Sequence, residues 1–212
     1  MIRILLADDH AIIRDGLRQI FADTDDLQVA GEAASGHEVM ARVREADWDI
    51  LLLDMSMPGK SGLELIKQIK AEKPRLPILV LSMHEPEQYA QRALRAGAAG
   101  YLSKDSDAPQ LIEVVRKVAR GGIFVSPGVA EQIARGIMPD AERLPHTLLS
   151  DREFQVFRLV AAGVAVTEIA HQLSLSVKTV STHKTRIMQK MNLDNHTELV
   201  RYALGHRLLD EH

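Results

Sequence analysis

Four short apolar segments in the first half of the chain each end in a residue that can bind a metal ion or a phosphoryl group. In chain order, these terminal residues are Asp8-Asp9, Asp54, Ser82 and Lys104. The carboxyl ends of parallel strands share one edge of an open α/β sheet, and ligands bind in the crevice there. The sequence therefore predicts that three carboxylates, one hydroxyl and one ammonium group lie close together.

Such a group of side chains could transfer a phosphoryl group to an aspartate. A carboxylate is a poor nucleophile toward phosphorus unless a divalent cation and a fixed positive charge relieve the repulsion between the anions. Mg²⁺ suits this role because it prefers oxygen ligands and takes one or two carboxylates. We interpret Asp54 as the phosphoryl acceptor. The expected metal ligands are Asp8, Asp9, Asp54 and the backbone carbonyl of Ser56.

The remaining two side chains have complementary expected roles. Lys104 would bind the phosphoryl oxygens, and Ser82 would donate a hydrogen bond to one of them. Each residue also has an ordinary structural interpretation, since Asp8-Asp9 could cap a helix and a lone aspartate often occupies a turn. Their occurrence at four successive strand ends favours the chemical interpretation.

The composition is that of an ordinary globular chain. Of its 212 residues, 46% are hydrophobic and 26% are charged, which is typical of domains with hydrophobic cores. The absence of cysteine excludes disulfides, thiol catalysis and thiolate metal sites. No basic start leads into a long apolar stretch, so we expect neither a signal peptide nor a membrane span, and a cytoplasmic location.

The first 120 residues alternate between two patterns. Short apolar runs typical of buried parallel strands occur at about 2–7, 28–33, 49–53, 77–82 and 99–103. Helical patterns lie between and after them, at 12–22, 37–46, 62–71, 86–96 and 108–120. This alternation predicts an α/β fold with a five-stranded doubly wound parallel sheet over residues 1–121.

The second half of the chain is predicted to be helical. Residues 122–147 indicate a linker with a short helix from Ser126-Pro127 to about 137, and residues 148–212 indicate a small four-helix domain. Ser150 and Glu153 fit a capping box. Helices predicted at 167–173 and 177–191, separated by a tight turn, are typical of a helix-turn-helix.

The predicted helix at 177–191 has the pattern of a DNA recognition helix. Val180, Ile187 and Met191 recur at helical spacing and should face the core. No acidic residue occurs between Glu168 and Asp194, although the chain as a whole has a net charge of −3. Short hydroxyl side chains can approach base edges, and long cations can contact phosphates. The predicted DNA-binding residues are Lys178, Thr179, Ser181, Thr182, Lys184, Thr185 and Arg186.

Residues 1–120 closely resemble the receiver domain of two-component response regulators. The matching residues are Asp8-Asp9, Asp54, Met57-Pro58-Gly59, Ser82, Ala98-Ala99-Gly100-Tyr101 and Lys104. The resemblance implies that a sensor histidine kinase phosphorylates Asp54 in a Mg²⁺-dependent step. It also implies a switch in which Ser82 moves toward the phosphoryl group and Tyr101 rotates inward. One departure is Asp105, which stands where receivers commonly have proline.

Residues 148–209 resemble the LuxR-type output domain, so the whole chain resembles a NarL/FixJ-like response regulator. The matching residues are Leu149-Ser150-Asp151-Arg152-Glu153, Gly163, Glu168-Ile169-Ala170, Leu173, Thr179-Val180-Ser181-Thr182-His183 and Lys190-Met191. The resemblance implies binding to double-stranded promoter DNA as a homodimer after phosphorylation, and we expect RNA polymerase as a further partner. Leu199, Val200 and Ala203 could form the dimer contact, but core packing explains this stripe equally well.

Two departures from the LuxR-type pattern affect specific expectations. Val164-Ala165-Val166 replaces the polar residues that usually precede the first helix of the helix-turn-helix, which leaves Thr167 as the nearest cap candidate. Ser181 stands where many relatives carry lysine, so their base preference cannot be transferred to this chain.

Three other functions compete with this interpretation. A haloacid-dehalogenase-like phosphatase needs a second carboxylate two positions after its nucleophile, where this chain has Ser56. A ligand-sensing LuxR-type regulator should carry an aromatic-lined pocket, and aromatic residues make up only 4% of the chain. A phosphorylation-independent regulator that uses the receiver as a dimer scaffold stays open. We therefore expect no enzyme beyond a receiver that catalyses its own phosphoryl transfer and dephosphorylation.

Overall fold

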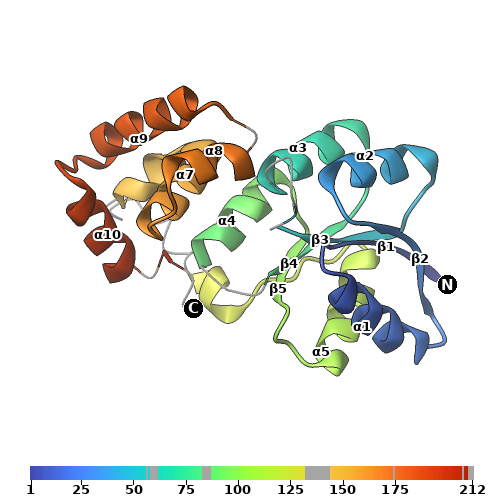
Figure 1. Ribbon diagram of the computed structural model, residues 1–212. Coiled ribbons are helices and arrows are strands. Elements are labelled where there is room, and N and C mark those ends of the chain that lie inside the picture. The colour runs from blue at the N-terminus through green and yellow to red at the C-terminus, as the bar shows by residue number, and fades with distance from the viewer. Residues whose placement is uncertain are drawn as a thin grey trace. The chain divides into compact units, whose positions relative to one another are not determined.

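The computed structural model divides the chain into two compact units, Met1–Gln132 and Ile133–His212. It describes residues 1–55, 57, 62–82, 87–131, 144–173, 175–206 and 208–209 (Figure 1). Within these residues, no helix combines the length and apolar character that crossing a membrane requires.

The N-terminal unit contains the predicted five-stranded parallel sheet, in the order β2-β1-β3-β4-β5. The strands are β1 (Ile2–Ala7), β2 (Leu27–Ala33), β3 (Ile50–Asp54), β4 (Ile78–Ser82) and β5 (Gly100–Ser103). The helices are α1 (Ala11–Ala22), α2 (Gly36–Glu45), α3 (Gly62–Glu72), α4 (Glu87–Ala96) and α5 (Ala108–Ala119). Helices α1 and α5 cover one face of the sheet, and α2 and α3 cover the other (Figure 1).

The core of this unit is centred on β1 and β3. All five residues of β3 are buried, and Ile4, Leu5 and Leu6 of β1 are fully inaccessible. A strand buried on both faces needs apolar side chains at every position, which explains the continuous apolar runs in the sequence. The predicted fold class is confirmed.

Strand β2 contains an irregularity that the sequence did not indicate. Ile4 pairs with Val29 and Leu5 pairs with Gly31, so Ala30 is an extra residue in β2. The ring of Trp48 lies over Gly31, and a Cβ atom at that position would overlap the ring. Glycine is therefore required here because an aromatic side chain approaches the strand closely.

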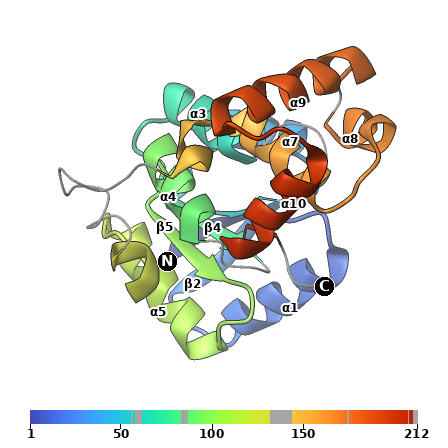
Figure 2. The ribbon, with the colours of Figure 1, turned by 90° about the vertical axis from the view of Figure 1, so that its left-hand side faces the viewer.

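The C-terminal unit is helical, as predicted. A short 3₁₀ turn, η1 (Pro145–Leu148), precedes α7 (Asp151–Ala161), α8 (Val166–Gln172), α9 (Val177–Met191) and α10 (His196–Gly205). Figure 2 shows these helices gathered around α7. The capping box of Ser150 and Glu153 is confirmed, because each side chain accepts the backbone N–H of the other residue.

The helix predicted from Ser126-Pro127 is described only in part. Residues 127–131 are helical, and residues 132–143 lie outside the described residues. The predicted linker is therefore described at its two ends only.

Candidate metal centre and nucleic-acid interface

An acidic cluster lies where β1 and β3 end. Asp8 directly follows β1 and Asp54 is the last residue of β3, and their exposed fractions are 1% and 2%. One ligand atom from each of Asp8, Asp9, His10 and Asp54 lies within 4.8 Å of the others. The structure therefore brings together the three carboxylates that the sequence predicted, and it adds an imidazole that the sequence did not indicate.

Lys104 lies between the two buried carboxylates. Its Nζ atom is 2.6 Å from Asp8 Oδ2 and 3.2 Å from Asp54 Oδ2, and its side chain is 6% exposed. Three carboxylates beside one ammonium group leave two uncompensated negative charges, which one divalent cation would balance. The carboxylate oxygens suit Mg²⁺ or Ca²⁺, whereas the His10 nitrogen suits neither ion.

The backbone around Asp8 fixes the direction of its carboxylate. Asp8 Oδ1 accepts a hydrogen bond from the His10 N–H at 2.8 Å, and Arg14 Nη1 donates to the Asp8 carbonyl at 2.7 Å. The N-cap of α1 is His10, whose side chain makes no capping bond. The alternative that Asp8-Asp9 caps a helix is therefore wrong, because the helix begins one residue too late for it.

The expected switch residues occupy neighbouring strands. Ser82 ends β4 and is half-buried, and it pairs with Ser103 of β5. Tyr101 of β5 is buried, with 2% exposure. The Lys104 N–H also donates to the Ser82 carbonyl at 2.7 Å, which joins the two strand ends at the acidic cluster. The predicted Ser56 ligand lies outside the described residues.

Asp105 fits the loop after β5 in a way that proline could not. Its backbone N–H donates to Ser103 Oγ at 3.2 Å. Proline has no N–H group and cannot make this bond. The departure from the receiver pattern is therefore accommodated within the loop itself.

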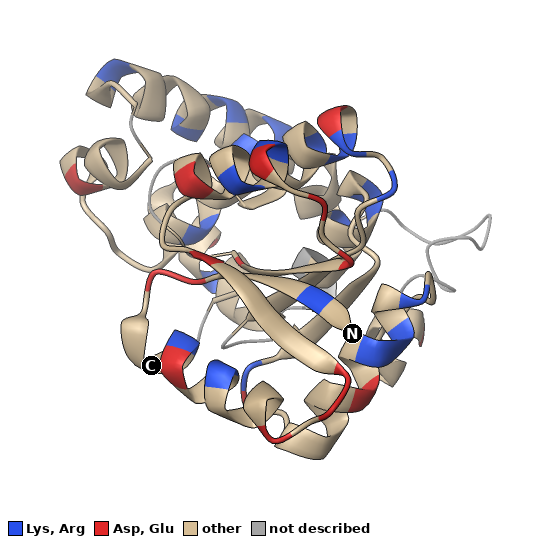
Figure 3. Ribbon diagram, turned by 90° about the vertical axis from the view of Figure 1, so that its right-hand side faces the viewer, with Lys and Arg blue, Asp and Glu red and all other residues tan. Residues whose placement is uncertain are grey.

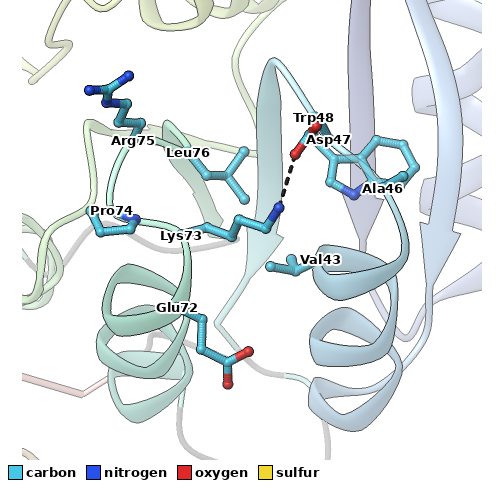
Figure 4. A pocket seen from close by; sticks show the side chains of 9 residues that line it. All are labelled: Val43, Ala46, Asp47, Trp48, Glu72, Lys73, Pro74, Arg75 and Leu76. Carbon is cyan, nitrogen blue, oxygen red and sulfur yellow. Dashed lines mark hydrogen bonds and ion pairs between the residues drawn. The ribbon is translucent and has the colours of Figure 1, made fainter.

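A cavity of about 360 Å³ lies away from the acidic cluster, between the C-terminal ends of α2 and α3 (Figure 4). Its walls are Val43, Ala46, Asp47, Trp48, Glu72, Lys73, Pro74, Arg75 and Leu76. Several of these residues precede β3 and β4, so the cavity lies at the opposite edge of the sheet from Asp54. Trp48 is the one aromatic residue in its lining, which is a poor match to the aromatic-lined pocket of a ligand sensor.

Helix α9 has a core-facing side and a polar side, as predicted. Val180, Ile187 and Met191 are buried. Lys and Arg recur along the helix (Figure 3). Five of the seven predicted DNA-binding residues are exposed, namely Lys178, Ser181, Thr182, Thr185 and Arg186. These five share the side of the helix that faces away from the core.

The other two predicted residues are half-buried on the flanks of α9. Lys184 borders the core-facing side. Thr179 belongs to the helix cap, since its Oγ1 lies 2.8 Å from Ser176 Oγ and its N–H donates to the same hydroxyl. Three exposed residues on α9 were not among the predicted DNA-binding residues. These are Gln189, which follows Thr182 and Thr185 at helical spacing, Val177, which is 48% exposed, and Lys190.

Comparison with known proteins identifies the family. Residues 4–116 match the response regulator receiver domain, and residues 147–203 match the luxR family of bacterial regulatory proteins. The chain is 40% identical to the oxygen regulatory protein NreC of Staphylococcus carnosus, over 98% of this chain and 99% of NreC. It belongs to the NarL/FixJ-like family of two-component response regulators.

Other relatives agree with this assignment. This response regulator is 36% identical to response regulator GacA of Pseudomonas viridiflava, over 99% of both chains. Among solved structures, it resembles RcsB from Salmonella enterica serovar Typhimurium bound to promoter rprA in the presence of phosphomimetic BeF₃⁻. That match has 30% identity and a TM-score of 0.69, and it covers 95% of this chain and 98% of RcsB. Neither matched domain is a catalytic enzyme family.

A charged cluster in this response regulator ties α9 to α7. Lys190 Nζ donates to the buried Glu153 carboxylate at 2.6 Å. Burial acts to raise the pKa of Glu153, but the hydrogen bonds from Lys190 and Ser150 outweigh it and lower the pKa. His183 Nδ1 is buried and has no hydrogen-bond partner among the described residues. Burial also lowers the pKa of His183.

One expectation about a helix end of this response regulator is corrected, and one open alternative about a helix face is decided for Leu199 and Ala203. Thr167 does not cap α8, because the N-cap is Ala165 and Thr167 lies inside the helix. Ala165 has no side-chain acceptor, so no side chain caps this helix. Leu199 and Ala203 are fully buried in the C-terminal unit, so they belong to its core and are not available for a dimer contact.

Proposed function

We propose that phosphorylation of Asp54 by a sensor histidine kinase controls binding of promoter DNA by α9. The observation that carries this proposal is the buried cluster of Asp8, Asp54 and Lys104, with Nζ within 3.2 Å of both carboxylates. A phosphoryl-transfer site needs this combination of an acceptor carboxylate, further carboxylates for a cation and a fixed positive charge.

The oxygen donors of the cluster fit a magnesium ion. Asp9 and Asp54 would supply carboxylate ligands, with Asp8 beside them and the Ser56 carbonyl as a backbone ligand. A bound Mg²⁺ supplies charge neutralisation for the phosphoryl oxygens. Asp9 is the more exposed carboxylate, with a side chain 30% exposed, so an ion bound there would be open to solvent on the side of Asp9.

In the transfer step, a carboxylate oxygen of Asp54 attacks the phosphorus of a phosphohistidine. The new P–O bond forms as the P–N bond breaks, and the imidazole of the kinase leaves. The Lys104 ammonium group moves from the Asp54 carboxylate and binds a phosphoryl oxygen. The Ser82 hydroxyl donates a hydrogen bond to another phosphoryl oxygen. The same site would then hydrolyse the aspartyl phosphate: water attacks phosphorus, the P–O bond to Asp54 breaks, and the Asp54 carboxylate leaves as inorganic phosphate is released.

The switch is a two-state equilibrium between receiver conformations. A phosphoryl group adds about −1.5 to −2 charges at Asp54, and it shifts the equilibrium only through its different affinity for the two states. Ser82 and Lys104 are the residues that would sense it, because the Lys104 N–H is bonded to the Ser82 carbonyl. Tyr101 of β5 would report this change in conformation.

The output would be sequence-specific DNA binding as a homodimer that recruits RNA polymerase. The relative RcsB is bound to promoter rprA in the presence of BeF₃⁻, which supports the same order of events here. A dimer contact on α10 would have to use exposed residues such as Leu204, which is 61% exposed.

The test compares wild type with Asp54→Asn after incubation with acetyl phosphate and Mg²⁺. We expect a phosphoryl adduct on wild type alone by intact mass spectrometry, and tighter binding of promoter DNA by wild type alone. Asp9→Asn keeps the acceptor Asp54 but removes an expected Mg²⁺ ligand, so Mg²⁺ should no longer promote phosphorylation of this variant. Asp23→Asn, at the exposed C-terminal cap of α1, is the matched control and should behave as wild type.

Equal DNA affinity of phosphorylated wild type and Asp54→Asn would contradict this proposal. That result would favour the phosphorylation-independent regulator, in which the receiver acts as a dimer scaffold.

A further inference from the structure

Three hydroxyl side chains occupy the middle of the exposed side of α9, and each one uses its hydrogen within the helix. Ser181 Oγ donates to the carbonyl of Val177 at 2.9 Å. Thr182 Oγ1 donates to the carbonyl of Lys178 at 2.9 Å, and Thr185 Oγ1 donates to the carbonyl of Ser181 at 3.2 Å. A carbonyl oxygen cannot donate, so the hydroxyl hydrogen must lie in each of these bonds.

This arrangement decides what the helix presents to a partner. With its hydrogen engaged, each hydroxyl offers only acceptor lone pairs to the outside. Thr182 and Thr185 also offer a methyl group each, and the exposed Val177 adds two more at the start of the helix. The hydroxyl surface, defined as Ser181, Thr182 and Thr185, is therefore a surface of acceptors and methyl groups.

Donors on the same side of α9 lie beyond this surface. Lys178 lies at the N-terminal end of the helix, Gln189 lies near its C-terminal end, and Arg186 lies beside the surface; all three are exposed.

The major groove of DNA distinguishes these two kinds of surface. Guanine displays only the acceptors N7 and O6 there, whereas adenine and cytosine display amino donors and thymine displays a methyl group. An acceptor can therefore pair with the amino group of adenine or cytosine but not with guanine, and the thymine methyl group distinguishes an A·T pair from a G·C pair. A threonine that presents an acceptor beside a methyl group matches an A·T pair, which displays an amino donor and a methyl group on the same edge.

We infer that the hydroxyl surface of α9 recognises A·T base pairs, with hydroxyl oxygens accepting from adenine N6 amino groups and threonine methyls contacting thymine methyls. This inference rests on the proposed function, because it names the bases that the proposed DNA interface contacts. To contact guanine, a hydroxyl would have to break its bond to the helix carbonyl. The loss of one such bond corresponds to about fivefold in affinity.

The experiment begins with selection of binding sites from a random DNA pool by the phosphorylated full-length chain. The inference predicts A·T pairs at the centre of each selected half-site. Single adenines there are then replaced by purine, which lacks the amino group, and single thymines by uracil, which lacks the methyl group. Each replacement should weaken binding of the wild type about fivefold.

Two substitutions at Thr185 separate the two contacts. Thr185→Val keeps methyl groups but removes one of the three acceptors, so it should lose the response to purine at one adenine position, keep it at the adenines that Ser181 and Thr182 contact, and keep the response to uracil. Thr185→Ser keeps the acceptor but removes the methyl group, so it should show the reverse. Thr197→Val, at an exposed threonine of α10, is the matched control and should respond as wild type does.

The outcomes distinguish this inference from the proposed function. Specific binding to half-sites centred on G·C pairs, or a Thr185→Val variant that still responds to purine at every adenine position to which wild type responds, would overturn the inference and leave the proposed function intact. Equal binding to all sequences in the pool would overturn both, because no sequence-specific interface would then exist.

Discussion

Lys104 places a buried positive charge between two buried carboxylates, and this makes the site dependent on it. Replacing Lys104 by methionine leaves Asp8 and Asp54 without their shared partner. Loss of one member of a buried ion pair typically costs about 3–5 kcal/mol. We therefore expect Lys104→Met to lower the free energy of unfolding of the N-terminal unit by about 3 kcal/mol, and Mg²⁺ to restore part of this loss.

The measurement is urea unfolding followed by tryptophan fluorescence, with and without Mg²⁺. The chain has one tryptophan, Trp48, and it lies in the N-terminal unit, so the signal reports that unit alone. Lys117→Met, at an exposed lysine of α5, should change the free energy by less than about 0.5 kcal/mol. If Lys104→Met were as stable as this control in the absence of Mg²⁺, the charge argument would be wrong.

His183 predicts a pH dependence in the C-terminal unit. Burial lowers the pKa of His183, Glu153 opposes this shift, and Arg152 and Arg186 reinforce it. Because the folded unit holds the neutral imidazole, the unfolded chain takes up the proton first as the pH falls below about 6.5. Stability should therefore be full above this value and decrease as the pH falls toward the lowered pKa of the folded state.

Thermal unfolding of wild type and His183→Gln between pH 5 and pH 7.5 tests this dependence. The difference between the two proteins cancels the titration of other groups. Wild type should lose more stability on acidification than His183→Gln, whereas His171→Gln, at an exposed histidine of α8, should follow wild type. Parallel pH profiles for wild type and His183→Gln would remove His183 from this account.

At the residue scale, sequence reasoning located the acidic cluster but not its contacts. Residues at strand ends can be predicted because parallel topology brings the ends of distant strands to one edge of the sheet. The bond from Lys104 to Asp8 and the hydroxyl bonds of α9 depend on side-chain rotamers, which spacing does not determine. Helical spacing of the apolar residues placed Thr185 on the exposed side of α9, and only the structure shows that its hydroxyl hydrogen is already used.

At the scale of secondary structure, α8 begins without a side-chain cap. Ala165 has the extended backbone of an N-cap, with φ −64° and ψ 143°, and offers no oxygen to the first turn. Ala165→Ser would let the serine hydroxyl accept the N–H of Thr167 or Glu168. A serine cap stabilises a helix by about 1 kcal/mol relative to alanine, so we expect the midpoint of thermal unfolding of the C-terminal unit to rise by several degrees.

Ala162→Ser is the control for this cap, because Ala162 is equally exposed but lies at the end of α7. It should leave the midpoint nearly unchanged. If both serines raised the midpoint alike, the gain would come from surface polarity and not from capping.

The helices and strands were largely predictable. The two features that were not, an extra residue in β2 and the role of an apolar stripe on α10, depend on contacts that the local sequence pattern does not reveal. Helix α9 was predicted with its observed bounds, because a tight turn precedes it and apolar residues recur along it at helical spacing; the structure adds that Ser176 caps it. The extra residue in β2 and the close approach of Trp48 to Gly31 were missed because both depend on contacts between residues far apart in sequence. The stripe of Leu199 and Ala203 was ambiguous because periodicity cannot separate a core contact from a contact with a second chain.

At the scale of the whole molecule, each compact unit has a core of its own and carries one of the two proposed binding sites. Domains with separate cores can unfold separately, and a ligand stabilises only the unit that binds it. Calorimetry should therefore show two transitions. Mg²⁺ should raise the midpoint of the N-terminal transition, which Trp48 fluorescence also reports. Promoter DNA should raise the free energy of unfolding of the C-terminal unit by about 2.7 kcal/mol when it is present at 100 times its dissociation constant.

Phosphorylation should add a coupling between these two transitions. If phosphorylation favours the DNA-binding state, linkage requires that DNA also stabilise the phosphorylated receiver, because a coupling free energy is reciprocal. After acetyl phosphate and Mg²⁺ treatment, DNA should therefore raise both transitions in wild type. In Asp54→Asn, DNA should raise only the transition of the C-terminal unit. This variant lacks the proposed phosphoryl acceptor, whereas its helix α9 is unchanged. A receiver transition that ignores DNA in phosphorylated wild type would mean that the two units act independently, and the proposed control of DNA binding by Asp54 would then fail.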